Sequence, residues 1–160
     1  MANTLPQLIE EDVQRLNDVL SELLEKSDAS AALIIDVGGF LICSQGDSRK
    51  FDFTTIAALT SGAFMANQTI ANLLHETSFN SVYQQGEKFS TFACCIDEQC
   101  MLVVIFKAQV SVGAVKYFSG PACQHIAEQL QVARDRDPGN GLDLSELNLA
   151  DTTDLFKRRG

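Results

Sequence analysis

"FTTIAALTSGAFMANQTIANLLH", from Phe53 to His75, contains no Asp, Glu, Lys or Arg, although the chain of 160 residues has a formal net charge of -9. Its spacing predicts a helix, and a helix with one face on a core normally carries charge on the other face. The stripe predicted to lie on a sheet consists of Ile56, Leu59, Ala63, Ala66, Ile70 and Leu73. The other uncharged face is therefore predicted to pack against a further element, in this chain or in another.

That second face is predicted to be a contact surface. Phe64 and Met65 lie about 120° or more from the centre of the stripe on a helical wheel. Small side chains there would let another helix approach closely, and depletion of charge is typical of an interface core. The residues predicted for a dimer or partner interface are Ala57, Ser61, Gly62, Phe64, Met65, Gln68 and Asn72. The alternative is that a loop or another helix of the same chain covers this face.

Patterns on both sides of this segment predict an α+β domain. Apolar residues at three- and four-residue steps indicate an amphipathic helix over 6–26, and another helix is expected to start near Ser111. Two strands joined at Gly38 and Gly39 precede the uncharged helix, Asp52 occupies its N-cap position, and three strand candidates follow it. The order is helix, two strands, helix, three strands, helix, which predicts a five-stranded antiparallel sheet with helices on its faces.

The pattern is interrupted twice towards the C-terminus. Gly120 and Pro121 fall within the last predicted helix and are expected to kink or break it. From Arg136 the sequence becomes acidic, with sparse leucines after a Pro- and Gly-containing linker. We therefore expect a domain over 1–135 and an acidic, flexible tail over 136–160. The tail residues predicted to contact a partner on a short helix are Leu144, Leu147, Leu155 and Phe156.

Composition argues against several classes of partner. A pI near 4.5 disfavours binding to nucleic acid or to anionic membranes. The uncharged segment contains too many Thr, Ser, Asn and Gln residues for membrane insertion. The first residues lack the features of a secretory signal, and five cysteines is an odd number, so we expect reduced thiols in a cytoplasm.

The sequence contains no recognisable catalytic or cofactor motif. The phosphate-binding, dinucleotide-binding and nucleophile-elbow patterns are absent, and His75 and His125 are isolated on predicted helices. Cys94, Cys95 and Cys100 do not have zinc-knuckle spacing, and alternation along a strand separates the first two. We therefore expect no metal, no cofactor and no catalytic residue, and interpret the cysteines as small apolar residues.

Two long runs carry a resemblance to a known family: ALIIDVGGFLICSQGDSRKFDFTTIAALTSGAFMANQTIANLL, and then FACCIDEQCMLVVIFKAQVSVGAVKYF. Their order of a D-x-x-G hairpin, an uncharged helix with a central T-[AS]-G, an LVVIF strand and an SVGAVK helix start resembles the roadblock / dynein light chain family. Within that family the resemblance is to the bacterial MglB-type proteins, and it covers Leu5 to about Leu130. The tail LSELNLADTTDLF is also similar to the acidic tails of those proteins.

The resemblance implies a homodimer in which the uncharged helices pack together and the central strands join into one sheet. Such a dimer binds one Ras-like small GTPase of the MglA type and promotes GTP hydrolysis by positioning its switch regions, in the control of cell polarity and motility. The resemblance also favours activation without an arginine finger, for which Arg49 is the only well-placed candidate. Two alternatives remain open: a roadblock scaffold without effect on hydrolysis, and a small-ligand sensor built on a five-stranded sheet.

Overall fold

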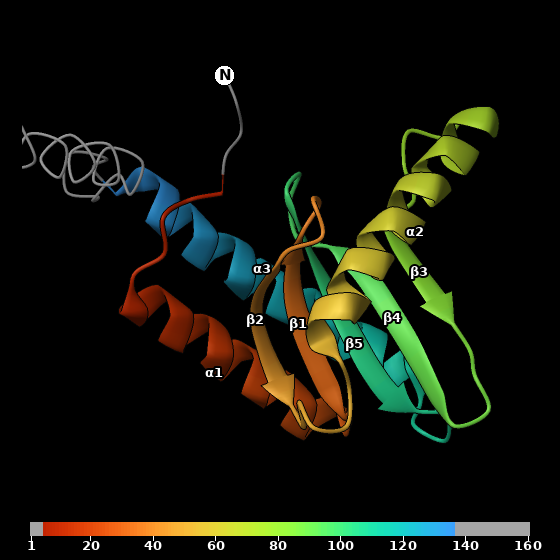
Figure 1. The fold of residues 1–160 in the computed structure, drawn as a ribbon, viewed down its shortest axis with the longest axis horizontal. Coiled ribbons are helices and arrows are strands. Elements are labelled where there is room, and N and C mark those ends of the chain that lie inside the picture. Colours follow the sequence, from red (N-terminus) through yellow and green to blue (C-terminus); the bar gives the residue numbers. More distant parts are fainter. Residues whose placement is uncertain (1–4, 137–160) are drawn as a thin grey trace, which may run out of the picture.

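The computed structural model describes residues 5–136 and has the predicted order of helices and strands. The elements are α1 (Glu10–Ser27), β1 (Ala31–Asp36), β2 (Leu41–Gly46), α2 (Phe53–Leu73), β3 (Ser81–Gln84), β4 (Phe89–Cys95), β5 (Cys100–Lys107) and α3 (Val112–Asp135). The α+β fold class expected from the sequence is therefore confirmed (Figure 1).

The five strands form one antiparallel sheet in the order β2-β1-β5-β4-β3. The central position of β5 explains its almost continuous apolar sequence, because both faces of this strand are covered. β2 and β3 form the two edges of the sheet. The sheet therefore has its most apolar strands, β1 and β5, at its centre.

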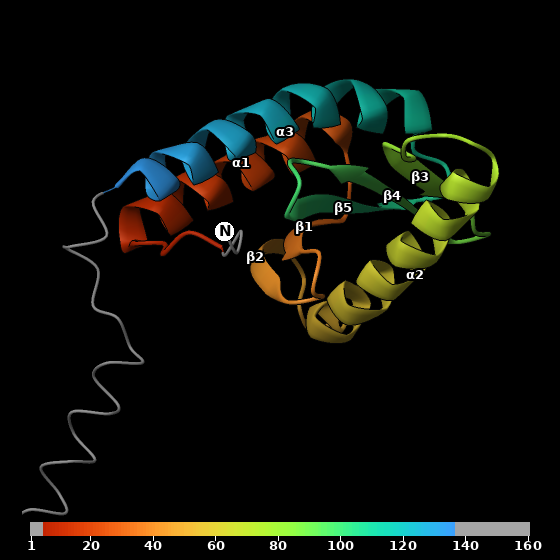
Figure 2. The same ribbon diagram turned by 90° about the horizontal axis from the view of Figure 1, so that it is seen from above.

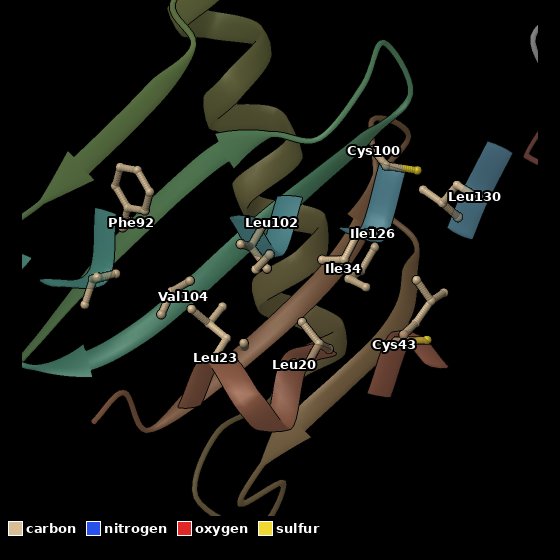
Figure 3. Packing of buried hydrophobic residues seen from close by; sticks show 14 of the residues in the cluster. Leu20, Leu23, Ile34, Cys43, Phe92, Cys100, Leu102, Val104, Ile126 and Leu130 are labelled. Atoms are coloured by element: carbon tan, nitrogen blue, oxygen red, sulfur yellow. The ribbon is translucent and has the colours of Figure 1, made fainter. Parts of the chain in front are cut away.

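Helices cover both faces of the sheet. α1 and α3 lie side by side on one face, and among the elements of residues 5–136 α2 is the one helix on the opposite face (Figure 2). Side chains of β1 and β5 alternate between the two faces, so Ile34 and Leu102 pack beneath α1 and α3 whereas Leu33 and Val103 pack beneath α2. Figure 3 shows the larger of the two cores, in which Leu20, Ile126 and Leu130 from the paired helices meet the sheet.

The first helix begins later than the predicted range of 6–26, at Glu10. The Asp12 carboxylate accepts a hydrogen bond from the Ile9 backbone N–H at 2.9 Å, which satisfies one of the free donors at the helix start. Periodicity alone could not fix this boundary, because it depends on which side chain caps the helix.

Gly120 and Pro121 were expected to kink or break the last helix, and they do not break it, because α3 is continuous through Pro121. Pro121 is exposed, and it removes only the N–H that would bond to the Tyr117 carbonyl. Buried residues on both sides of the proline hold the two halves of α3 against the same core: Val115, Ser119, Ala122, Ile126, Leu130 and Ala133. Packing therefore outweighs the local loss of one hydrogen bond.

No helix within residues 5–136 is long and apolar enough to cross a membrane.

Candidate functional site

One face of α2 packs on the sheet. Phe53, Ala57, Ser61 and Ala71 are buried, and Phe64 is half-buried against the same cluster. These residues also follow three- and four-residue spacing, so α2 carries two apolar stripes rather than one.

Two contacts with the turn between β1 and β2 set the rotation of α2 about its axis. The Ser61 hydroxyl donates a hydrogen bond to the Val37 carbonyl in the turn between β1 and β2. In the same turn Gly39 has a φ of 93°, and a Cβ at this position would lie 3.1 Å from Cα of Ala58. Glycine is therefore required both by the backbone conformation and by the close approach of the helix.

The N-cap prediction for α2 is confirmed. The Asp52 carboxylate accepts hydrogen bonds from the Thr55 N–H at 3.1 Å and from the Thr55 hydroxyl at 2.6 Å. The hydroxyl bond is the main reason that the pKa of Asp52 is lowered. This cap supplies a carboxylate at the positive end of an otherwise uncharged helix.

The opposite face of α2 is exposed and uncharged. Leu59, Met65 and Leu73 are 69%, 64% and 76% exposed, and Ile70 is 48% exposed. We call this face the α2 surface and define it by Leu59, Gly62, Ala63, Met65, Ala66, Ile70 and Leu73. An exposed apolar stripe of this length on a helix is typical of an interaction site.

The expected orientation of the helix is therefore wrong. The sequence pattern assigns Leu59, Ala63, Ala66, Ile70 and Leu73 to the core, and none of the five is buried. Both stripes have helical spacing, and periodicity cannot tell which of two apolar stripes meets the sheet.

The residues predicted for the interface divide between the two faces. Ala57 and Ser61 are buried within the chain, and their side chains are not available to a partner. Phe64 is half-buried, as is Gln68, whose amide donates a hydrogen bond to the Phe79 carbonyl at 3.3 Å. The exposed members of the predicted set are Gly62, Met65 and Asn72.

Sequence reasoning missed two apolar side chains beside this surface. Phe40 is 72% exposed and Val37 is 39% exposed, and both flank the turn that packs against Ala58. The signal was present in the sequence, because VGGF places large apolar residues on both sides of a turn that normally carries polar ones.

Arg49 lies in the loop before α2. Its side chain is 91% exposed, and its Nε lies 3.1 Å from Oδ1 of Asp47. This is a solvent-exposed ion pair, and pairs of this kind contribute little to stability.

The cavity between α2 and strands β3, β4 and β5 is too small for a metabolite. Its volume is about 40 Å³, and it is lined in part by Phe64, Val82 and Met101. This volume admits one water molecule or two. The cavity therefore gives no support to the small-ligand sensor.

Groups that could perform chemistry are dispersed across the described residues. His75 and His125 are exposed at the end of α2 and on α3, and no cluster of three or more His, Cys, Asp or Glu residues within 5–136 could hold a metal ion. All five cysteines have free thiols, and the Sγ atoms of Cys94 and Cys123 lie 3.4 Å apart, a contact that the sequence did not indicate.

The predicted tail contacts lie outside the described residues. These are Leu144, Leu147, Leu155 and Phe156. The last described residue, Arg136, forms an ion pair with the buried Asp12 of α1 at 2.8 Å. The division between domain and tail after residue 135 stays a prediction.

Comparisons with known proteins agree with the fold and the arrangement of helices. The family model for the Roadblock/LC7 domain matches residues 15–106. A structure described as MglB with tetrameric arrangement has a TM-score of 0.76 and 27% identity, with 80% of this chain and 96% of that chain covered. The structures of Myxococcus xanthus MglB and of the gliding protein MglB from Thermus thermophilus each have a TM-score of 0.74 and 28% identity. In both, 79% of this chain and 96% of the other chain are covered. No curated protein sequence matches this chain significantly.

Proposed function

Because the chain belongs to the Roadblock/LC7 domain family, we propose that it is a homodimeric regulator of a Ras-like small GTPase of the MglA type. It binds the GTPase and promotes hydrolysis of GTP by holding the switch regions of its partner in the reactive arrangement. The structural likeness to MglB proteins supports this role.

The observation that carries the proposal is the exposed, uncharged α2 surface. Exposed apolar stripes are rarely left in water, and self-association through identical surfaces is the commonest arrangement of soluble homo-oligomers. Gly62 lies in the middle of this surface, and a Cβ placed on it would meet nothing within 4 Å apart from its chain neighbours and the backbone of its own helix. A second α2 can therefore approach most closely at Gly62.

Regulation without a catalytic residue of its own fits the chemistry of phosphoryl transfer. Positioning and electrostatic stabilisation account for most of the catalysis in GTPases, and a partner can improve both by ordering mobile switch segments. In the proposed mechanism Arg49 stays outside the GTPase active site, and the transition state is stabilised by groups of the GTPase itself.

A single-turnover hydrolysis assay tests the proposal. A purified MglA-type GTPase encoded in the same genome is loaded with GTP and mixed with an excess of the full-length protein. We expect the rate constant to rise at least about tenfold, equivalent to about 1.4 kcal/mol of barrier. Gly62→Arg should lose this effect, whereas Gln124→Arg, on the opposite side of the sheet, should keep it.

The assay also separates the regulator from the scaffold. Binding to the GTPase with an unchanged hydrolysis rate would identify a non-catalytic roadblock scaffold and contradict the activating role. Absence of binding to any Ras-like GTPase of the organism would contradict both.

A further inference from the structure

Cys94 and Cys123 come from separate elements and meet on the side of the sheet away from α2. Cys94 is in β4 and Cys123 is in α3, 29 residues further along the chain, and their Sγ atoms are 3.4 Å apart. Both side chains pack at the edge of the core formed by α1, α3 and the sheet, and both are partly exposed. The contact is therefore built by tertiary structure and is within reach of small solutes.

The two thiols differ in their acidity. At 3.4 Å one thiol donates its hydrogen to the other sulfur, and this contact lowers the pKa of Cys123 and raises that of Cys94. The thiolate is the reactive form of cysteine. The pair therefore places a more easily ionised sulfur beside a protonated one.

The remaining cysteines lack this arrangement. Cys43 and Cys100 are buried, with 6% and 0% exposure, and burial raises the pKa of each. Cys95 is adjacent to Cys94, but alternation along β4 directs it to the other face of the sheet. Burial also raises the pKa of Cys95.

We propose that Cys94 and Cys123 form a specific oxidation site, at which peroxide converts the two thiols into an intrachain disulfide between β4 and α3. The Cys123 thiolate attacks one oxygen of hydrogen peroxide, the O–O bond breaks, and hydroxide leaves and takes up a proton to become water. The product is the sulfenic acid of Cys123.

Cys94 completes the reaction. Its sulfur attacks the sulfur of the sulfenic acid, an S–S bond forms, the S–O bond breaks, and the hydroxyl leaves as water with the proton of the Cys94 thiol. In total two thiols are oxidised to one disulfide, and one peroxide is reduced to two waters.

The disulfide would fix α3 to the sheet close to Pro121. The sulfur atoms must approach from 3.4 Å to about 2.05 Å, which small adjustments of side chains and backbone can provide. Cys123 follows Pro121 by two residues, at the place where α3 lacks one backbone hydrogen bond. The site lies opposite the α2 surface, so oxidation should leave self-association unchanged.

Peptide mapping of the folded full-length protein tests this site. The protein is treated with hydrogen peroxide, free thiols are blocked in denaturant, and tryptic peptides are analysed without reduction. We expect the loss of two of the five thiols and a linked pair of peptides covering 89–107 and 117–134. Peptide 89–107 also contains Cys95 and Cys100, so variants must assign the bond.

The variants form a matched set. Cys95→Ser should form the linked peptides as the wild type does, whereas Cys94→Ser and Cys123→Ser should each lose them. Oxidation should also raise the Tm of the wild type by roughly 5–10 °C, reversed by a reducing agent. Since this comparison uses only the wild type, it does not depend on whether a variant folds.

Three results would overturn the proposal. The first is a linked peptide that persists in Cys94→Ser. The second is a disulfide between two copies of the chain. The third is equal loss of all five thiols in the folded protein.

Discussion

Single side chains determine which surfaces of this molecule are buried. Ser61 binds the turn between β1 and β2, and Gly39 allows α2 to approach that turn, so the two together fix which stripe of α2 meets the sheet. Neither role could be predicted from periodicity, because both depend on contacts between residues that are distant in sequence. The sequence did predict the cap at Asp52, because capping is a local interaction.

Asp12 is a buried charged residue whose replacement should reduce stability in a way that depends on pH. It is fully buried and accepts hydrogen bonds from the Arg136 guanidinium at 2.8 and 2.9 Å and from the Gln129 amide at 2.7 Å. The bond to Arg136 is the main reason that the pKa of Asp12 is strongly lowered. Asp12→Asn should lower the free energy of unfolding at pH 7 by roughly 2–3 kcal/mol.

This effect should depend on pH with a defined sign. Because the folded pKa lies below the unfolded value of about 3.9, Asp12 stabilises the fold above that pH, and its contribution falls as the pH decreases towards the folded pKa. Urea unfolding at pH 7 and at pH 3 should therefore show a smaller difference between wild type and Asp12→Asn at pH 3. Arg15→Ala, which removes an exposed pair with Glu11, is the control and should cost less than about 1 kcal/mol. A difference independent of pH would contradict the account.

Arg49 is expected to have no role in hydrolysis. Its guanidinium is paired with Asp47 in an exposed loop, and the proposed mechanism does not use it. The rate of GTP hydrolysis stimulated by Arg49→Ala should therefore be within about twofold of the rate stimulated by the wild type. Loss of an arginine finger would lower this rate by about 10³-fold or more. A variant that binds normally but no longer activates would identify Arg49 as that finger.

At the level of the elements, α2 shows how far a sequence pattern can be taken. The absence of charge from Phe53 to His75 correctly predicted two apolar faces, but assigned Leu59, Ile70 and Leu73 to the wrong one. The resemblance to a known family also does not indicate which face of α2 meets the sheet. The strands are easier to predict, because β5 is apolar from Cys100 to Phe106, as expected of a strand that is buried on both faces.

A charge placed on the α2 surface should leave the fold of one chain intact but disrupt the association of two chains. Gly62→Arg places its side chain in open space in the single chain and replaces a poor helix former with a better one, so the helix content by circular dichroism should not fall. If two α2 helices meet there, the same change should raise the Kd of the dimer at least about 100-fold, or about 3 kcal/mol. Phe64→Asp is a poorer test, because Phe64 also contributes to the core beneath α2.

Measurement of the dissociation constant by analytical ultracentrifugation checks this prediction. Gln124→Arg, which adds the same charge to the exposed side of α3, is the control and should leave the constant unchanged. Equal dissociation constants for Gly62→Arg and Gln124→Arg would show that the contact lies elsewhere.

In α3 the proline is a local weakness rather than a break. Pro121→Ala restores the N–H that can bond to the Tyr117 carbonyl, and Pro121 is exposed, so little packing is lost. We expect a gain of about 1 kcal/mol or more, seen as a Tm several degrees higher. Gln124→Ala, at another exposed position of α3, should change the Tm by much less. A lower Tm for Pro121→Ala would mean that the proline itself stabilises the folded chain.

At the scale of the whole molecule, the two faces of the sheet have separate roles. α1 and α3 close the larger core, and ion pairs from Arg134 to Asp97 and from Arg136 to Asp12 hold the last turn of α3. Within the described part of the chain, the other face carries α2, whose outer apolar surface is exposed. Neither the ion pairs nor the contact between Cys94 and Cys123 could be predicted, because each joins residues at least 29 positions apart.

The tail is expected to act on the partner and not on the dimer. Deletion of residues 142–160 removes the predicted contacts at Leu144, Leu147, Leu155 and Phe156 without touching the α2 surface. The mass of the assembly should stay the same, whereas the affinity for the GTPase or its rate of nucleotide exchange should change and should depend on salt. The rate of nucleotide exchange is measured by release of a fluorescent nucleotide from the GTPase, with the full-length protein and with the protein that lacks the tail. Equal affinity and equal exchange would exclude a role for the tail in partner binding.

The proposed function depends on the α2 surface joining two copies of this chain. The most direct test is the mass of the wild-type protein by light scattering at micromolar concentration. We expect the wild-type protein to have at least twice the chain mass of 17.5 kDa, and the Gly62→Arg variant to have the mass of a single chain. A wild-type protein with the mass of one chain would contradict this expectation.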